Sequence, residues 1–143
     1  MVTILRQAGA ALLYFALVFG AGFAFGALRA AVVAPRLGER NAELAEAPLM
    51  LVTILLVGWL VSRIFRRLTW QELFGSGVAA AAMVLLADLA VGISLRGLTP
   101  PEILFRRDSL TGAVYYLLIG LYAVAPAMFA LPRTRLPEEY SAE

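Results

Sequence analysis

The sequence predicts an all-α integral membrane protein whose four transmembrane helices pack as an up-and-down bundle. Of its 143 residues, 62% are hydrophobic and only 15% are charged, against about 25% charged in a typical soluble domain. The mean hydropathy is +0.83, and the charges gather between long apolar runs, a pattern typical of membrane spans. We place the spans at residues 8–33, 48–64, 77–95 and 110–131, within one domain over 1–132 that is followed by a polar tail over 133–143.

The composition excludes several kinds of chemistry. The chain has no cysteine and no histidine, which excludes disulfides, thiolate or imidazole ligation of a metal or haem, and catalysis by either side chain. We therefore expect no metal and no cofactor. The net charge is +2, too small to indicate a nucleic-acid partner. All the basic residues are arginine, which, with the many alanines, is typical of a bacterium with a G+C-rich genome.

The first span, which is too long for the apolar part of a signal sequence, carries a repeat of small residues. Gly22, Gly26 and Ala30 recur every four residues, and such spacing lets a second helix approach closely, inside the bundle or in a self-associated pair. A second small-residue run, at residues 77–82, has the same potential. Arg29 lies near the end of the first span, where an arginine either extends to the membrane surface or pairs with a carboxylate.

The connector over residues 35–47 holds most of the polar chemistry. Pro35 is expected to break or kink the first helix, and Gly38 permits a turn. The candidate polar residues here are Glu39, Arg40, Glu43 and Glu46. Because the three glutamates lie at i, i+4 and i+7, a helical connector places them on one face. This pattern fits either a solvated helix with weak ion pairs or a site for a hard cation or a basic ligand.

Asp88 lies well inside the third predicted span. A carboxylate in the hydrocarbon is expensive, so it marks a functional site by default. Its candidate partner is Arg29, with Arg96 as the alternative. A third possibility is a structural hydrogen bond to a serine, threonine or tyrosine of the bundle.

The orientation follows only from the distribution of arginines. Arginines divide equally between the two sides of a four-span topology, so the positive-inside rule is tied. The densest group is Arg63, Arg66 and Arg67, and we expect it and both termini to face the cytoplasm.

The stretch from Gly26 to Pro48, GALRAAVVAPRLGERNAELAEAP, resembles a pattern in small, uncharacterised bacterial inner-membrane proteins with four predicted helices. The resemblance covers under a third of the chain. It implies a location in the inner membrane and brings no assigned activity. Small multidrug-resistance transporters, by contrast, have a glutamate in the middle of their first helix, and the asparagine and phenylalanine signatures of fluoride channels are not found here.

Three functions fit these patterns. The first is a non-enzymatic accessory subunit that lies in membrane lipid and packs against copies of itself or a larger membrane complex. The second is a small oligomeric transporter or channel that uses Asp88 and Arg29. This function requires Asp88 to face a water-filled cavity, whereas the accessory role requires Asp88 to be paired and shielded from water. The third is a lipid-modifying enzyme with the connector glutamates as metal ligands or acid–base groups, and it has the least support because no histidine, cysteine or aspartate pair accompanies them.

Overall fold

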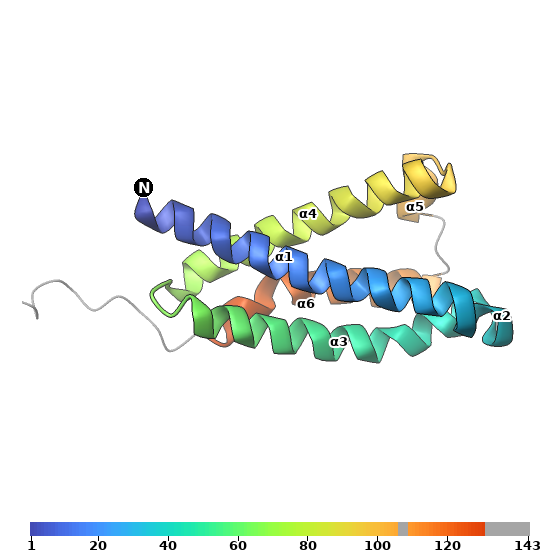
Figure 1. Ribbon diagram of the computed structural model, residues 1–143, viewed down its shortest axis with the longest axis horizontal. Coiled ribbons are helices and arrows are strands. Elements are labelled where there is room, and N and C mark those ends of the chain that lie inside the picture. The colour runs from blue at the N-terminus through green and yellow to red at the C-terminus, as the bar shows by residue number, and fades with distance from the viewer. Residues whose placement is uncertain (106–108, 131–143) are drawn as a thin grey trace, which may run out of the picture.

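The computed structural model describes residues 1–105 and 109–130, and this part of the chain is helical without any strand. The elements are α1 (Val2–Leu28), the π-helix η1 (Arg29–Val33), α2 (Ala34–Leu37), α3 (Glu39–Ile64), α4 (Trp70–Arg96), α5 (Pro100–Phe105) and α6 (Ser109–Met128). The long helices α1, α3, α4 and α6 alternate in direction along the bundle (Figure 1). Four helical segments are long and apolar enough to cross a membrane. The predicted all-helical class with four candidate spans is confirmed, and the predicted tail over 133–143 lies outside the described residues.

The helices extend further than the apolar runs predicted. The first helical segment continues to Leu37 and α3 begins at Glu39, so the connector shrinks to Gly38. This glycine has φ +79°, a backbone conformation that residues with a Cβ rarely adopt. Pro48 consequently lies inside α3 and not at its start. Hydropathy marks the apolar length only, whereas alanine and glutamate, which make up six of residues 39–47, have high helix propensity.

Pro35 does not end the first helix, contrary to expectation. The chain passes from α1 through the five-residue π-helix η1 into α2, and Pro35 lies at the first turn of α2. Proline removes one helical hydrogen bond and its ring collides with the carbonyl four residues earlier. The wider π turn immediately before it relieves that collision, and Arg29 is the first residue of this turn.

The helices pack most closely at the end of the bundle that holds the start of α1, residues 65–69 and the last turns of α6, here called the closed end. A Cβ on Gly77 of α4 would overlap the carbonyl oxygen of Ala123, and a Cβ on Gly58 of α3 would lie 3.0 Å from the Cβ of Ala125. Because these two glycines have no side chain, α3 and α4 both pack closely against α6. The close packing predicted for residues 77–82 is confirmed at Gly77.

The predicted packing face on the first helix has a different role. A Cβ on Gly26 would meet nothing within 4 Å, and one on Gly22 would meet only the Met50 side chain, at 3.4 Å. Ala30 is exposed. Among the described residues, only the Met50 side chain of α3 comes within 4 Å of a Cβ at Gly22 or Gly26, and close packing of a helix along this stripe stays a prediction. Self-association through it stays a prediction.

The bundle opens away from the closed end. Near the start of α1, Ser76 Oγ of α4 donates a hydrogen bond to the Gln7 carbonyl (3.1 Å), and Gln7 Nε2 donates to the Glu72 carbonyl (3.3 Å). Thr69 and Glu72 form a capping box that sets the first residue of α4. From this junction α4 diverges from α1 toward α5 (Figure 1). The opposite end, which holds η1, α2, the start of α3 and α5, is here called the open end.

Candidate functional site

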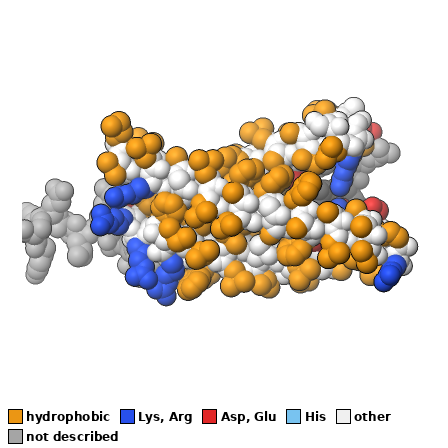
Figure 2. Space-filling model, viewed as in Figure 1, with side chains coloured by type: hydrophobic (Ala, Val, Ile, Leu, Met, Phe, Trp, Pro, Cys, Tyr) orange, Lys and Arg blue, Asp and Glu red, His pale blue; other side chains and the backbone are white. Residues whose placement is uncertain are grey.

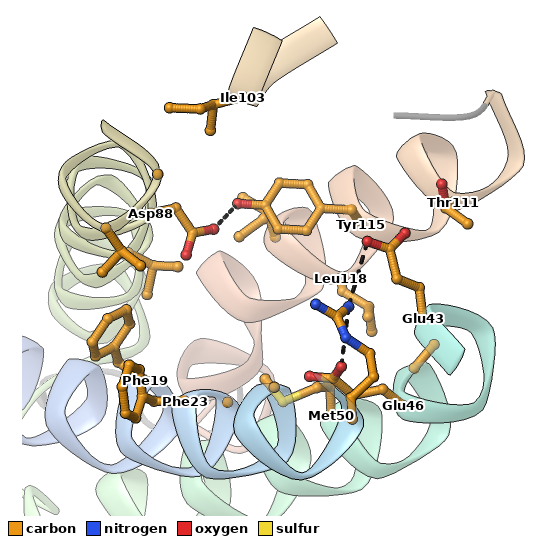
Figure 3. Close-up of a pocket in the computed structure, with 18 of the residues that line it drawn as sticks. Phe19, Phe23, Glu43, Glu46, Met50, Asp88, Ile103, Thr111, Tyr115 and Leu118 are labelled. Carbon is orange, nitrogen blue, oxygen red and sulfur yellow. Dashed lines mark hydrogen bonds and ion pairs between the residues drawn. The ribbon is translucent and has the colours of Figure 1, made fainter. Parts of the chain in front are cut away.

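A cavity of about 630 Å³ lies between the four long helices in the open half of the bundle. Its walls are mostly apolar, with Phe19 and Phe23 from α1, Met50 from α3 and Leu118 from α6. Figure 3 shows these side chains around one space, with Asp88 and the two glutamates also facing it. The stripe Gly22, Gly26 and Ala30 forms part of the wall. The cavity therefore exists partly because this stretch of α1 has small side chains.

Arg29 forms ion pairs with two glutamates across the end of the cavity. Its Nη1 lies 3.4 Å from Glu43 Oε1 and 3.4 Å from Glu46 Oε2, and the three side chains are only 15%, 24% and 17% exposed. Of the two alternatives for Arg29, extension to the membrane surface or pairing with a carboxylate, the structure shows pairing, with Glu43 and Glu46. One guanidinium between two carboxylates leaves this group with a formal charge of −1.

Asp88 accepts a hydrogen bond from the hydroxyl of Tyr115 on α6, as Figure 3 shows. The predicted ion pair between Asp88 and Arg29 is wrong, and so is the alternative with Arg96, which is exposed and lines the mouth of the cavity. The structural hydrogen bond, the third possibility, is confirmed. Asp88 nevertheless lines the cavity, so this residue has a hydrogen-bond partner and still borders the open space.

Two of the candidate polar residues do not reach the site. Glu39 and Arg40 are exposed and are not among the residues that line the cavity. The i, i+4, i+7 spacing does place Glu39 on the face of Glu43 and Glu46, but Glu39 is the first residue of α3 and lies beyond the cavity's end. In residues 1–105 and 109–130, no three carboxylates come together in a way that could hold a metal ion.

Several residues that line the cavity were not among those predicted from the sequence. Tyr115 and Tyr122 are seven residues apart on α6, a spacing that places them on one helix face. The sequence could therefore have predicted that these two tyrosines share a face. Glu102 comes from the short helix α5, where it accepts a hydrogen bond from the Thr99 backbone N–H (2.9 Å). The position of Glu102 depends on how α5 lies against α4, and the spacing of residues in the sequence does not predict that arrangement.

Six charged side chains are found among the described residues that line the cavity. Its described lining contains the carboxylates Glu43, Glu46, Asp88 and Glu102 and the guanidiniums Arg29 and Arg96. Figure 2 shows charged atoms in the gap between the diverging ends of α1 and α4, while the rest of the face in view is mainly hydrophobic between the two ends of the bundle. Among the described residues, the lining therefore has more carboxylates than guanidiniums.

Tyr122 lies deeper in the cavity than Tyr115 and has an unsatisfied hydroxyl. The residue is 2% exposed and its ring stacks on Tyr14 with 4.3 Å between centroids. The hydroxyl oxygen is buried and makes no hydrogen bond within the described residues, and the same is true of Arg29 Nε. A buried polar group without a partner costs about 1–3 kcal/mol. Both residues line the cavity, but these two atoms are themselves buried.

Comparisons with protein-family models, with curated proteins and with solved structures found no match. The resemblance over residues 26–48 therefore stays a prediction, and the function is argued from the site.

Proposed function

We propose that the protein is inserted in a membrane and binds an amphipathic small molecule in its cavity, as a small carrier or binding protein. The observation that carries this proposal is the cavity of about 630 Å³, apolar over most of its lining and supplied with polar groups from several helices. Small-molecule sites generally have this character, with volumes of about 300–1,000 Å³ and a few convergent polar groups.

The outer surface supports membrane insertion. Large hydrophobic side chains are exposed on all four long helices, including Leu12, Leu17, Leu56, Leu86 and Leu117. Helices satisfy their own backbone hydrogen bonds, as a segment in hydrocarbon must. At the closed end, the Arg63 guanidinium lies 5.4 Å from the Trp59 ring centre, a pairing that suits the boundary between hydrocarbon and water.

We propose the bacterial inner membrane as the location, with the closed end and both termini in the cytoplasm. Arg29 is left out of the arginine count, because it forms ion pairs with two glutamates in the cavity and does not act as a loop charge. Without Arg29, the sequence has six arginines on the side of the closed end and five on the other side, which favours the closed end as cytoplasmic. The cavity would open at the opposite surface.

The second candidate is an accessory subunit, and one observation favours it. The stripe Gly22, Gly26 and Ala30 faces a cavity that no helix of the described chain fills. Small residues at this spacing suit the close approach of a helix, so the occupant would then be a helix of a partner, either a second copy or another protein.

The test compares two glycines on the same helix. Gly26 lines the cavity and Gly20 does not, and each has open space around its Cβ position. The protein is purified gently from its membrane and weighed intact by native mass spectrometry. We expect a bound small molecule that is retained in the wild type and in Gly20→Leu and lost in Gly26→Leu.

Two outcomes would contradict the binding function. If all three proteins carry the same small molecules, the cavity is not where they bind. If the wild type instead carries a second polypeptide that Gly26→Leu loses, the accessory role replaces it.

A further inference from the structure

We propose that the closed end of the bundle binds the headgroup of an anionic phospholipid. The binding surface is here called the arginine cluster and consists of Arg6, Arg63, Arg66 and Arg67. This inference goes beyond the proposed function, because it concerns the outer surface at the closed end and does not depend on what the cavity binds.

Segments far apart in the sequence bring these arginines to one end of the molecule. Arg6 lies near the start of α1, and the other three lie in the last turn of α3 and the turn that follows it. The two segments touch, since a Cβ on Gly9 of α1 would lie 3.6 Å from the Phe65 ring. Figure 2 shows basic side chains gathered at the end that holds the N-terminus, with no acidic side chain beside them in this view.

The turn that carries Arg66 and Arg67 is held in place by its neighbours. Leu68 is 2% exposed, and its backbone N–H donates a hydrogen bond to the Phe65 carbonyl (3.0 Å). The next residue, Thr69, caps α4. The two arginines between these anchors are exposed. The backbone that presents them is therefore ordered before a ligand binds, which lowers the cost of binding.

The described carboxylates leave the positive charge of the arginine cluster in place. None of its four arginines forms an ion pair with a carboxylate in residues 1–105 and 109–130. The acidic residue of the first turn of α4 is Glu72, whose Oε2 accepts a hydrogen bond from the Thr69 backbone N–H (2.7 Å). Four exposed or partly exposed guanidiniums in one region attract an anionic partner.

The apolar surroundings of the cluster favour a lipid over a water-soluble anion. Ile4 and Leu5 lie beside Arg6, Ile64 follows Arg63, and all three apolar side chains are more than half exposed. An anionic phospholipid supplies acyl chains for these side chains and a phosphate that a guanidinium binds through two N–H groups. Clusters of about four or more basic residues beside a membrane span are typical of contacts with anionic lipids.

The chain offers a fluorescent probe at this end. It has 2 tryptophans: Trp59, whose ring centre lies 5.4 Å from Arg63 Cζ, and Trp70, the first residue of α4. The full-length protein is reconstituted in phosphatidylcholine bilayers in which a fixed minor fraction of the lipid has brominated acyl chains, because bromine quenches tryptophan fluorescence on contact. The brominated lipid is either phosphatidylglycerol or phosphatidylcholine, and the ratio of the two quenching effects gives the preference for the anionic headgroup.

We expect the wild type to prefer phosphatidylglycerol by about fivefold or more, since one basic side chain near an anionic membrane surface contributes about that factor. Arg66→Gln should lower the preference by about twofold or more, and the double variant Arg66→Gln, Arg67→Gln should lower it further. The matched control is Arg36→Gln, which removes the same charge from an exposed residue of α2 at the open end and should keep the wild-type preference. Brominated phosphatidylcholine should quench all these proteins equally if folding and insertion are unchanged.

Three results would overturn this inference. The two brominated lipids could quench the wild type equally, or the preference could survive the loss of both Arg66 and Arg67; in either case the arginine cluster is not a headgroup site. If Arg36→Gln lowers the preference as much as Arg66→Gln does, net charge attracts the lipid and this surface does not. None of these results bears on the cavity, which Gly26→Leu tests separately.

Discussion

At the scale of single residues, Arg29 joins the end of the first helix to the start of the third by contacting Glu43 and Glu46. Each partner is less than a quarter exposed, so these pairs are screened less than surface ion pairs. Their value lies mainly in preventing two carboxylates from facing each other in an apolar setting, because a charge left without its partner is more costly than the pair is stabilising.

Replacing Arg29 with methionine should therefore lower the free energy of unfolding by about 1–3 kcal/mol. Thermal unfolding in detergent measures the effect. The control is the triple variant Arg29→Met, Glu43→Gln, Glu46→Gln, which removes the charges together and should recover most of the loss. A triple variant as unstable as the single one would show that Arg29 acts by packing and not by charge.

At the scale of helices, two kinds of glycine occur in this chain. Gly77 is needed for contact, since its Cα lies against the backbone of Ala123, whereas Gly26 borders open space. Sequence spacing predicted a packing role for both.

Gly77→Ala and Gly26→Ala should consequently change stability in opposite directions. A methyl group at residue 77 must push α4 and α6 apart and should cost about 1–3 kcal/mol. The same change at residue 26 meets nothing and gains about 0.5–1 kcal/mol of helix propensity. Unfolding of the two variants under identical detergent conditions tests this, and equal effects would mean that the helices are rotated differently about their axes.

The sequence predicted the helices well and their rotations poorly. Apolar length located all four spans, and the glutamate spacing placed Glu43 and Glu46 on one face. These helices are apolar almost all round, however, so hydropathy does not report which face of α1 or α4 turns inward. The partner of Asp88 and the role of Gly26 both depend on that rotation. The π turn before Pro35 and the cavity itself arise from several helices together, which no local pattern reveals.

At the scale of the whole molecule, the bundle is asymmetric. At the closed end α6 packs tightly against α3 and α4, whereas a cavity lies toward the end where α1 and α4 diverge (Figure 1). Our orientation places the hollow end away from the cytoplasm. The chain has no cysteine, so single-cysteine variants report directly on sidedness. A membrane-impermeant thiol reagent added to intact cells should label Glu39→Cys and leave Arg66→Cys unlabelled; the reverse result would invert the topology.

The most direct test of a polar, accessible cavity inside a membrane-inserted bundle uses two neighbouring residues. Leu118 lines the cavity, whereas Leu117 is 73% exposed on the outer surface and should face lipid, where a thiol is neither hydrated nor ionised. We predict that Leu118→Cys reacts with a membrane-impermeant methanethiosulfonate, while Leu117→Cys does not. Equal reactivity at both positions, or a Leu118→Cys that reacts only once the protein is unfolded, would contradict the account.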